Sequence, residues 1–340
     1  MAWTKPMPAN PVVAVAGATG AVGREMLITL AQRNFPASRV IALASARSAG
    51  KTLPFAGGEL TVEEMTPASF DGVDIALFSA GASVSKELRD VVVGAGCIMI
   101  DNSSAFRMDD DVPLVVPEAN PEDVAWHSGV IANPNCSTIQ MVVVLKPLDG
   151  LAEIKRVVVS TYQAASGAGA AAMEELYSQS RDFLMGQELH VVNFAHRIAF
   201  NCIPQIDVFR SDRSTKEEWK MIVETRKILH LPDLKISATC VRVPVLRCHS
   251  ESINVEFAEP AFLGAVIETL GDAPGLTVLD DNAAQEYPMP ALLEGTDDVY
   301  VGRIRRDDSV TYGVDLWCVA DQLRKGAALN AVQIAEVLLG

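Results

Sequence analysis

The sequence predicts a two-domain α/β protein in which an N-terminal dinucleotide-binding domain is followed by an α+β domain. A chain of 340 residues is long enough for two domains that each bury a core. The first half alternates short apolar strands with helices, which is typical of a parallel sheet. From Ile154 the predicted strands become longer, apolar and polar residues alternate along them, and few helices lie between them. This pattern favours antiparallel strands with helices on one face.

The composition excludes several classes of protein. With 49% hydrophobic and 21% charged residues, the chain resembles an ordinary globular protein. The net charge of −15 disfavours nucleic acid and acidic lipid, so an anionic ligand must be held by a few local Arg and Lys residues. The six cysteines lack zinc-site spacing, so we expect no metal and free thiols in a reducing cytoplasm. No apolar run approaches the roughly 20 residues of a membrane span, and the run from Val12 predicts strand and turn rather than a signal peptide.

The first predicted strand runs directly into a glycine-rich turn. Residues 11–16 are apolar, the turn Gly17-Ala-Thr-Gly20-Ala-Val-Gly23 follows, and a helix is expected at about 22–34. Glycines at these spacings permit a tight turn and let the backbone approach a pyrophosphate. An ordinary glycine-rich turn is the alternative, but the order of strand, turn and helix favours dinucleotide binding.

The end of the second strand, residues 39–43, indicates which dinucleotide binds. An NAD site requires an Asp or Glu there to bind the ribose hydroxyls. The sequence instead provides Arg47, Ser48 and Lys51 and no acid, which favours the 2′-phosphate of NADP. For any one of these residues, a solvated basic loop is the alternative.

A polar loop closes the alternation of strands and helices in the first half. The expected elements are a hairpin at 53–62, strands at 73–78 and 97–100, and a helix at 83–93. The loop Asp101-Asn-Ser-Ser-Ala-Phe-Arg107-Met lies at the carboxyl end of a strand, where ligands bind in open α/β sheets. Arg107 is either an anion anchor or closes a surface loop against Asp109 to Asp111.

Residues 133–140, Asn-Pro-Asn-Cys-Ser-Thr-Ile-Gln, place one thiol at the start of a predicted helix. Apolar side chains recur at helical spacing from Ser137 to Leu148, so Cys136 should lie beside free backbone N–H groups and the positive end of the helix dipole. That position lowers the pKa of a thiol. Cys136 is therefore a candidate nucleophile, the alternative being a small buried hydrophobic residue.

Polar side chains also mark the second half. Gln163 ends the strand predicted from 154 to 164 and either orients a substrate or merely belongs to a turn. Ser214 is expected to cap a helix whose first turns carry Glu217 and Lys220, charges that most often serve solubility.

Two further strands, 235–245 and 247–257, are expected to pair and to carry Arg242 and His249. An Arg among apolar neighbours needs an anion, either from the protein or from a ligand. His249 lies in a dense polar cluster, with a structural histidine as the alternative. A last helix, 323–339, is expected to return to the first domain.

These pieces together indicate aldehyde oxidation through a thioester, because a nicotinamide cofactor, an activated Cys, a His and cationic anchors occur in one chain. Over essentially its whole length the chain resembles the aspartate-semialdehyde dehydrogenase family. The matching motifs are Gly17-Ala-Thr-Gly-Ala-Val-Gly23, Asp101-Asn-Ser-Ser-Ala-Phe-Arg107-Met, Val116-Pro-Glu-Ala-Asn120, Asn133-Pro-Asn-Cys-Ser-Thr138, Tyr162-Gln-Ala-Ala-Ser-Gly-Ala-Gly169, Arg242-Val-Pro-Val and Leu323-Arg-Lys-Gly-Ala-Ala-Leu-Asn-Ala331.

The resemblance implies a glyceraldehyde-3-phosphate-dehydrogenase-like architecture. A Rossmann-type NADP-binding domain would comprise residues 1–134 and the C-terminal helix 322–340, and a catalytic, substrate-binding and dimerisation domain residues 135–321. The implied activity is that of an NADP-dependent phosphorylating aldehyde dehydrogenase, which reduces L-aspartyl 4-phosphate with NADPH to the semialdehyde and releases phosphate. This step leads toward threonine, methionine and, through diaminopimelate, lysine. A homodimer, or a tetramer, is also implied.

The resemblance assigns catalytic roles residue by residue. Cys136 matches the acyl-thioester nucleophile, His249 the acid/base and Gln163 the residue that orients the substrate. Arg242, seven positions before the histidine, matches the arginine that binds the α-carboxylate bidentately. We expect Cys136 at the domain junction, with His249 within hydrogen-bonding reach directly or through one water.

The remaining matches concern the rest of the substrate and the cofactor. Arg107 and Lys220 match the phosphate-binding pair, Asn135 a substrate-binding position, and Glu217 the group that takes the ammonium, although Glu218 is adjacent. The positions that match NADP contacts are Gly17, Thr19, Gly20, Ala21, Val22, Arg47, Ser48, Ser166, Gly167 and Gln322.

Two other functions are compatible with the same fold. N-acetyl-glutamyl-phosphate reductase shares the architecture, but its nucleophile motif resembles Gly-Cys-Tyr-Pro rather than the Asn-Cys-Ser-Thr found here. A non-catalytic NADP-sensing protein could keep the same fold. The joint presence of Cys136, Gln163, Arg242 and His249 argues against the second alternative.

Overall fold

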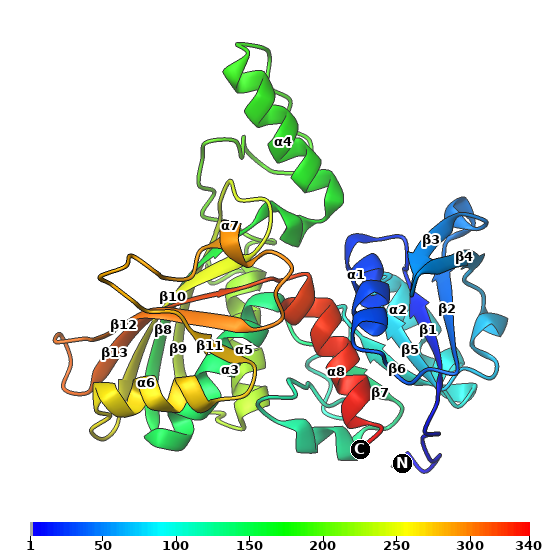
Figure 1. Ribbon diagram of the computed structural model, residues 1–340, viewed down its shortest axis with the longest axis horizontal. Helices are drawn as coiled ribbons and strands as arrows, with labels where there is room; N and C mark the ends of the chain where they lie inside the picture. Colours follow the sequence, from blue (N-terminus) through cyan, green and yellow to red (C-terminus); the bar gives the residue numbers. More distant parts are fainter. Residues whose placement is uncertain (1–2) are drawn as a thin grey trace. The chain divides into compact units, whose positions relative to one another are not determined.

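The computed structural model describes residues 3–340, and the chain folds into two compact units (Figure 1). Unit one extends to Asn135 and includes the C-terminal stretch from Ala327. Unit two runs from Cys136 to Gly326. The chain thus passes from unit one to unit two directly before Cys136.

Unit one is built on a seven-stranded sheet. Its strands are β1 (Val12–Ala16), β2 (Arg39–Ala44), β3 (Thr52–Phe55), β4 (Gly58–Glu64), β5 (Ile75–Phe78), β6 (Ile98–Asp101) and β7 (Val130–Ala132). Their order is β3-β4-β2-β1-β5-β6-β7, and all pairs are parallel except the antiparallel hairpin of β3 and β4. The predicted Rossmann-type alternation and the predicted hairpin are confirmed.

Helices accompany this sheet in the order that a parallel sheet requires. They are α1 (Ala21–Gln32), α2 (Ala82–Gly94), α8 (Leu329–Val337) and the 3-10 turns η1 (Ala46–Ser48), η2 (Pro67–Phe70) and η3 (Pro121–Trp126). Helix α8 contacts α1, β5 and β6, and its Ala331 and Ile334 belong to the same buried core as Val15 and Leu77. The C-terminal helix therefore completes the core of unit one.

The predicted single helix over 323–339 is wrong at its start. Residues Arg324–Ala328 form a π-helix, η5, and α8 begins only at Leu329. A π turn widens the helix by one residue and is frequent at functional sites. Gly326 of this π turn lies against Cys136.

Unit two is built on a six-stranded sheet. Its strands are β8 (Ile154–Gln163), β9 (Lys235–Arg242), β10 (His249–Phe257), β11 (Leu276–Val278), β12 (Val299–Arg306) and β13 (Gly313–Ala320). The order is β11-β12-β13-β10-β8-β9. The central pairs are antiparallel, as predicted, but the edge pairs β8/β9 and β11/β12 are parallel.

The predicted pairing of strands 235–245 and 247–257 is wrong. Strand β8 lies between β9 and β10, so these two are not neighbours. The reason is the long connection from β8 to β9, which contains α4 (Ala170–Leu184) and α5 (Lys216–Leu229). A connection of this length and helical content carries the chain back to the end of the sheet where β8 started, which permits parallel pairing.

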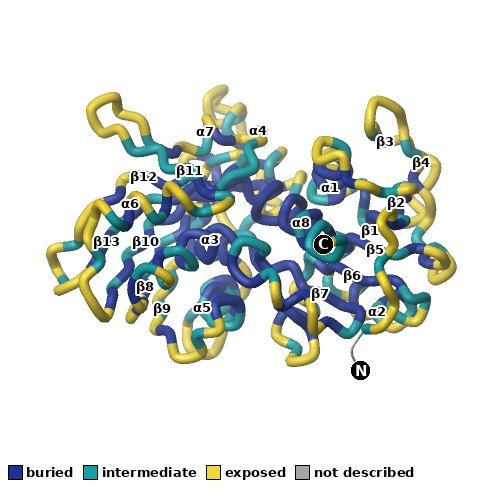
Figure 2. Tube along the Cα trace, turned by 60° about the horizontal axis from the view of Figure 1, so that its bottom comes forward, coloured by how far each residue is buried: buried dark blue, intermediate teal, exposed yellow. Residues whose placement is uncertain are grey.

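Three helices contact this sheet and bury one of its faces. Helix α3 (Cys136–Leu151) contacts β8, β10, β12 and β13, α5 contacts β9, and α6 (Leu263–Asp272) contacts β11 and β12. Along β8, Val157, Val159 and Thr161 are buried, whereas the intervening Ser160 and Tyr162 are partly or fully exposed. Helix α3 is buried along most of its length, as the dark blue tube of Figure 2 shows.

The start of α5 differs from the predicted one. Thr215, not Ser214, is the N-cap, and its hydroxyl accepts a hydrogen bond from the backbone N–H of Glu218. The Glu218 carboxylate accepts one from the N–H of Thr215 in return, which completes a capping box. Ser214 instead hydrogen-bonds to Asp212 in the preceding turn.

Within residues 3–340, no helix has the length and apolar character needed to cross a membrane. The remaining short elements are η4 (Ala165–Ala168), which follows β8, and α7 (Pro290–Leu293).

Candidate active site

One end of the neighbouring strands β10, β8 and β9 gathers residues from distant parts of the chain. Gln163 ends β8 and Arg242 ends β9, and the two are register partners because these strands are parallel. His249 begins β10 at the same end, because β10 is antiparallel to β8 and the next residue, Ser250, is the register partner of Tyr162. The sheet topology therefore brings Gln163, Arg242 and His249 to the same end of adjacent strands, which the sequence alone did not reveal.

Cys136 is the first residue of α3, as the sequence predicted. It is partly exposed, whereas Cys97, Cys240, Cys248 and Cys318 are buried. Burial raises the pKa of the Cys97 and Cys248 thiols to about 12, and it also raises the pKa of the other two buried thiols. These four thiols are therefore protonated near neutral pH and are poor nucleophiles.

Arg242 is buried and interacts electrostatically with Cys136. Burial lowers the pKa of the guanidinium, while the negative charges of Cys136 and Glu217 raise it. Nη1 of Arg242 donates a hydrogen bond to the backbone carbonyl of Ala164 at 2.5 Å. The guanidinium is thus held in place by the turn that follows β8.

The backbone of the same residue, Ala164, also holds His249. Its backbone N–H donates to Nδ1 of His249 at 3.0 Å, so in the neutral ring the proton resides on Nε2. Burial, together with the nearby charge of Arg242, lowers the pKa of His249 well below its ordinary value, which keeps the ring neutral near pH 7. Nε2 has no hydrogen-bond partner among residues 3–340, so this N–H remains available to a ligand.

Gly167 lies directly against both side chains. A Cβ at this position would be 2.9 Å from Nη1 of Arg242 and 3.0 Å from Nε2 of His249. Only glycine leaves the present positions of these two groups undisturbed. Gly326, in the π-helix, has the same relation to Cys136, since a Cβ there would be 2.9 Å from the Cβ of Cys136.

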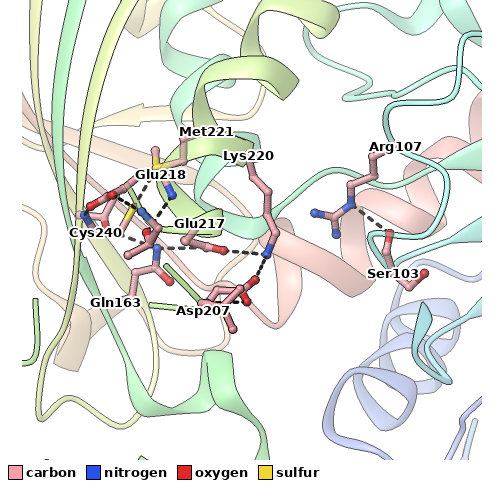
Figure 3. A network of polar contacts seen from close by, with 12 residues as sticks. Ser103, Arg107, Gln163, Asp207, Glu217, Glu218, Lys220, Met221 and Cys240 are labelled. Carbon is pink, nitrogen blue, oxygen red and sulfur yellow. Dashed lines mark hydrogen bonds and ion pairs between the residues drawn. The ribbon is translucent and has the colours of Figure 1, made fainter. Parts of the chain in front are cut away.

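A polar network extends from Gln163 into α5 (Figure 3). Nε2 of Gln163 donates to Oε1 of Glu217 at 3.3 Å. The other Glu217 oxygen pairs with Nζ of Lys220 at 3.1 Å, and Asp207 pairs with the same Nζ at 2.7 Å. Glu217 is buried and Lys220 largely so, which strengthens these ion pairs relative to exposed ones.

The neighbouring glutamates of α5 have different roles. Both oxygens of Glu218 accept hydrogen bonds from backbone N–H groups, those of Thr215 and Cys240. Glu218 therefore stabilises the helix start and ties it to β9. Glu217 instead joins Gln163 and Lys220, so it is the glutamate of the polar network.

Two further predicted residues of unit two lie together. Gln322 donates through Nε2 to the hydroxyl of Ser166, and its Oε1 accepts from the N–H of Cys248 at 2.8 Å. Gln322 thus joins the η4 turn to the residue before His249. Cys248 itself has a left-handed backbone with φ of 71°.

In unit one, the predicted glycine turn lies between β1 and α1. Gly17 has φ of 86°, and a Cβ there would be 2.4 Å from the carbonyl oxygen of Ser79. A Cβ at Gly23 would be 2.2 Å from the oxygen of Gly17, so α1 packs tightly on the turn. Gly20 is the N-cap of α1, and a Cβ there would lie 3.4 Å from the carbonyl oxygen of Gly17. A pyrophosphate fits this helix start, whose first turn comprises Ala21 and Val22 after Thr19.

The residues after β2 agree with a phosphate-bearing ribose. Arg47 and Ser48 lie in η1, directly beyond the end of β2, where Arg47 is exposed and Ser48 partly so. No Asp or Glu occurs between Ala44 and Lys51. The donor set therefore suits a 2′-phosphate better than a free ribose diol.

Arg107 and Asn135 are both buried residues of unit one. The Arg107 guanidinium donates to the carbonyls of Ser103 and Asn102, each at 3.0 Å, and Figure 3 shows the first of these bonds. Asp111, one of the acids proposed to close the loop, pairs with Arg89 at 2.7 Å. The loop after β6 therefore fixes Arg107 through its own backbone.

Three contributors to the site were not identified from the sequence. Ala164 acts through its peptide group, Gly326 through its missing side chain, and Asp207 through its ion pair with Lys220. Only Asp207 carries a charged side chain, and it lies between α4 and α5, outside any helix or strand. The other two depend on strand order and on a π turn.

Comparison with known proteins agrees with this architecture. The model of the semialdehyde dehydrogenase NAD-binding domain matches residues 12–127, and the model of the semialdehyde dehydrogenase dimerisation domain matches residues 145–325. The predicted fold class is therefore confirmed, and unit one contains an NAD(P)-binding domain.

Named relatives extend over nearly the whole chain. Aspartate-semialdehyde dehydrogenase of Aquifex aeolicus is 56% identical, covering 96% of this chain and 97% of its own. The structure of aspartate semialdehyde dehydrogenase II from Vibrio cholerae, complexed with ASA, has a TM-score of 0.94 at 46% identity and covers 97% of this chain and 98% of its own. The Candida albicans enzyme with NADP has a TM-score of 0.75 at 27% identity over 97% and 98%. The chain belongs to the aspartate-semialdehyde dehydrogenase family.

Proposed function

We propose that this protein catalyses the NADPH-dependent reductive dephosphorylation of L-aspartyl 4-phosphate to L-aspartate 4-semialdehyde and phosphate. The reaction would serve the synthesis of threonine, methionine and, through diaminopimelate, lysine. The observation that carries the proposal is the convergence of Arg242, His249 and Gln163 at the same end of adjacent strands, with Arg242 interacting with Cys136.

The charges of the substrate match the groups of the site. The α-carboxylate binds the buried Arg242, whose planar guanidinium suits bidentate contact. Glu217 takes the ammonium, and this choice over Glu218 is supported by the backbone bonds that occupy Glu218. Arg107 and Lys220 hold the phosphate, and Asn135 is a further substrate-binding position.

Cys136 provides the covalent step. Its thiolate attacks the acyl carbon, the bond from that carbon to the phosphate oxygen breaks, and the phosphate departs with a proton taken up from the surroundings. A thioester remains. The start of α3 and the guanidinium of Arg242 both favour the thiolate over the thiol.

His249 acts on the oxygen of the reacting carbonyl. Because Nδ1 accepts from Ala164, the neutral ring offers its Nε2–H as a donor. This hydrogen bond stabilises the negative oxygen that forms when the thioester carbon is reduced. Collapse of that intermediate breaks the bond from carbon to sulfur, expels Cys136 as thiolate and releases the aldehyde. If His249 is also to take up a proton, as acid–base catalysis requires, Nδ1 must become protonated. The hydrogen bond that Nδ1 accepts from the Ala164 N–H must then break.

NADP is the proposed cofactor, and when bound in its reduced form it supplies the hydride. The turn from Gly17 to Gly23, with Thr19, Ala21 and Val22, accommodates the pyrophosphate, and Arg47 and Ser48 take the 2′-phosphate. Ser166, Gly167 and Gln322 are the proposed contacts from unit two. The proposed cofactor-binding domain comprises residues 1–134 with 322–340, and the proposed substrate-binding and dimerisation domain residues 135–321. The compact units divide slightly differently, after Asn135 and after Gly326.

A cytoplasmic homodimer, or a tetramer built from it, is the proposed assembly. The matched dimerisation domain supports association of this chain with copies of itself. The unit-two sheet has one face covered by α3, α5 and α6, and residues such as Tyr162 on the other face are exposed in the single chain. That face is the proposed contact between protomers.

The activity is tested in the reverse direction. Purified protein is mixed with aspartate semialdehyde, phosphate and NADP⁺, and the absorbance of the reduced cofactor is followed. We expect phosphate-dependent turnover that disappears in Cys136→Ala and persists in Cys202→Ala, a control at an exposed cysteine. Absence of turnover in the wild type, or undiminished turnover in Cys136→Ala, would refute the mechanism.

A further inference from the structure

Asp207 lies beside the proposed substrate site but has no role in the mechanism above. It belongs to the segment between α4 and α5 and lines a cavity of about 230 Å³ that Arg242 also lines. Residues 193–195, 203, 205 and 206 form much of the remaining wall. A carboxylate in the same cavity as the arginine proposed to bind the substrate calls for an explanation, because it adds negative charge near the proposed anionic ligand.

The contacts of Asp207 point to Lys220. Oδ2 of Asp207 lies 2.7 Å from Nζ of Lys220, and Glu217 contacts the same Nζ from α5 at 3.1 Å, as Figure 3 shows. A lysine ammonium has three N–H donors. Two of them are engaged by these carboxylates, and the third bonds to no residue of the described chain 3–340. Two fixed acceptors therefore determine where the third N–H can point.

The two carboxylates also keep Lys220 charged. Its side chain is only 12% exposed, and burial by itself would lower its pKa. The negative charges of Glu217 and Asp207 overcome that effect, so the pKa of Lys220 is raised. In turn, the hydrogen bond from Lys220 contributes to lowering the pKa of Asp207 against the opposing effect of burial.

The backbone around Asp207 holds its carboxylate in a defined position. Asp207 has φ of 66°, a left-handed conformation that Asp and Asn tolerate better than other side chains. Its Oδ1 accepts from the N–H of Val208 at 2.8 Å. Val208 in turn accepts from the N–H of Lys216 at 2.9 Å, at the first residue of α5. The loop is thus tied to the helix that carries Lys220.

We propose that Asp207 is a positioning residue for phosphate binding: together with Glu217 it fixes two N–H groups of the Lys220 ammonium and directs the third toward the phosphate. The inference rests on the proposed function, in which Lys220 binds the phosphate. Removing Asp207 leaves Lys220 with one carboxylate, a lower pKa and a freely rotating ammonium. Phosphate affinity then falls, while binding of the semialdehyde through Arg242 is preserved.

The test uses Asp207→Asn in the full-length protein. Asparagine has nearly the same shape and adopts the left-handed conformation readily, so the loop is retained. Asp212→Asn is the matched control, since Asp212 is an acid of the same loop that bonds to Ser214 instead of Lys220. Turnover of semialdehyde is measured with NADP⁺ while phosphate and semialdehyde are varied separately from about pH 6 to 10.

We expect the KM for phosphate to rise on the order of tenfold in Asp207→Asn, as for the loss of one charge-assisted hydrogen bond. The KM for semialdehyde should stay within about twofold in this comparison. The alkaline decline of phosphate use should begin at lower pH, because the pKa of Lys220 falls. Asp212→Asn should match the wild type in all three measurements.

Several outcomes would overturn the inference. An unchanged phosphate KM would mean that Asp207 is dispensable, and a lower one would mean that Asp207 competes with phosphate for Lys220. Should Asp207→Asn fail to fold, Asp207→Glu is tested instead. Because this variant keeps the negative charge, its phosphate use should decline at the same alkaline pH as that of the wild type, and a decline at lower pH would refute the proposal. An inactive wild type would refute the proposed function itself, a result distinguishable from each of these.

Discussion

Replacing Gly167 by alanine tests the geometry of the site most directly. The added methyl group would lie 2.9 Å from Nη1 of Arg242 and 3.0 Å from Nε2 of His249. Ordinary contact begins at about 3.5 Å, so one or both groups must move by roughly 0.5 Å. Arg242 is held by Ala164 and His249 is fully buried, which leaves little room to relax.

Overpacking of this kind costs about 1–3 kcal/mol. If most of that cost falls on the arrangement of Arg242 and His249, kcat/KM for the semialdehyde should drop by about tenfold to a hundredfold, or ~1.4–2.7 kcal/mol. The measurement is steady-state oxidation of aspartate semialdehyde with phosphate and NADP⁺. Circular dichroism and thermal unfolding verify that the variant is folded.

Gly264→Ala is the matched control, because Gly264 lies in α6 of the same unit and a Cβ there meets no atom within 4 Å. It should retain wild-type kinetics. Wild-type kcat/KM in Gly167→Ala would refute the reasoning. A loss confined to NADP⁺ affinity would also refute it, since Gly167 would then act on the cofactor alone.

Three further predictions concern the carboxylate anchor, the cofactor and the buried carboxyl group of Glu251. Arg242→Lys keeps the charge but loses the planar fork, so the semialdehyde KM should rise at least about tenfold with NADP binding intact; equal loss of both would mean a structural role. Arg47→Glu should shift the cofactor preference from NADP toward NAD, measured as the ratio of kcat/KM with NADP⁺ to kcat/KM with NAD⁺. An unchanged ratio would exclude Arg47 from the 2′-phosphate site. Burial raises the pKa of Glu251 well above its ordinary value of 4.5, so the folded state binds this proton more tightly and the wild type loses stability as pH rises above that value. Glu251→Gln should remove this loss of stability. In denaturant titrations, the free energy of unfolding of the variant minus that of the wild type should therefore increase from pH 5 to 8. A difference that does not change with pH would contradict the prediction.

The sequence by itself determined the local elements and the motif chemistry. Apolar periodicity marked the strands of both sheets, and the glycine turn after β1 and the start of α3 at Cys136 follow from neighbours a few residues apart. Such features depend on interactions that are local in the chain. They therefore leave a direct trace in the residue pattern.

Tertiary structure decided the features that depend on residues far apart in sequence. Strand order placed β8 between β9 and β10, against the predicted pairing, because the long α4–α5 connection returns the chain to the same end of the sheet. The capping box of Thr215 occupied Glu218 and left Glu217 to the polar network. The proton position on His249 and the ion pair of Asp207 with Lys220 likewise arise from contacts that no local pattern encodes.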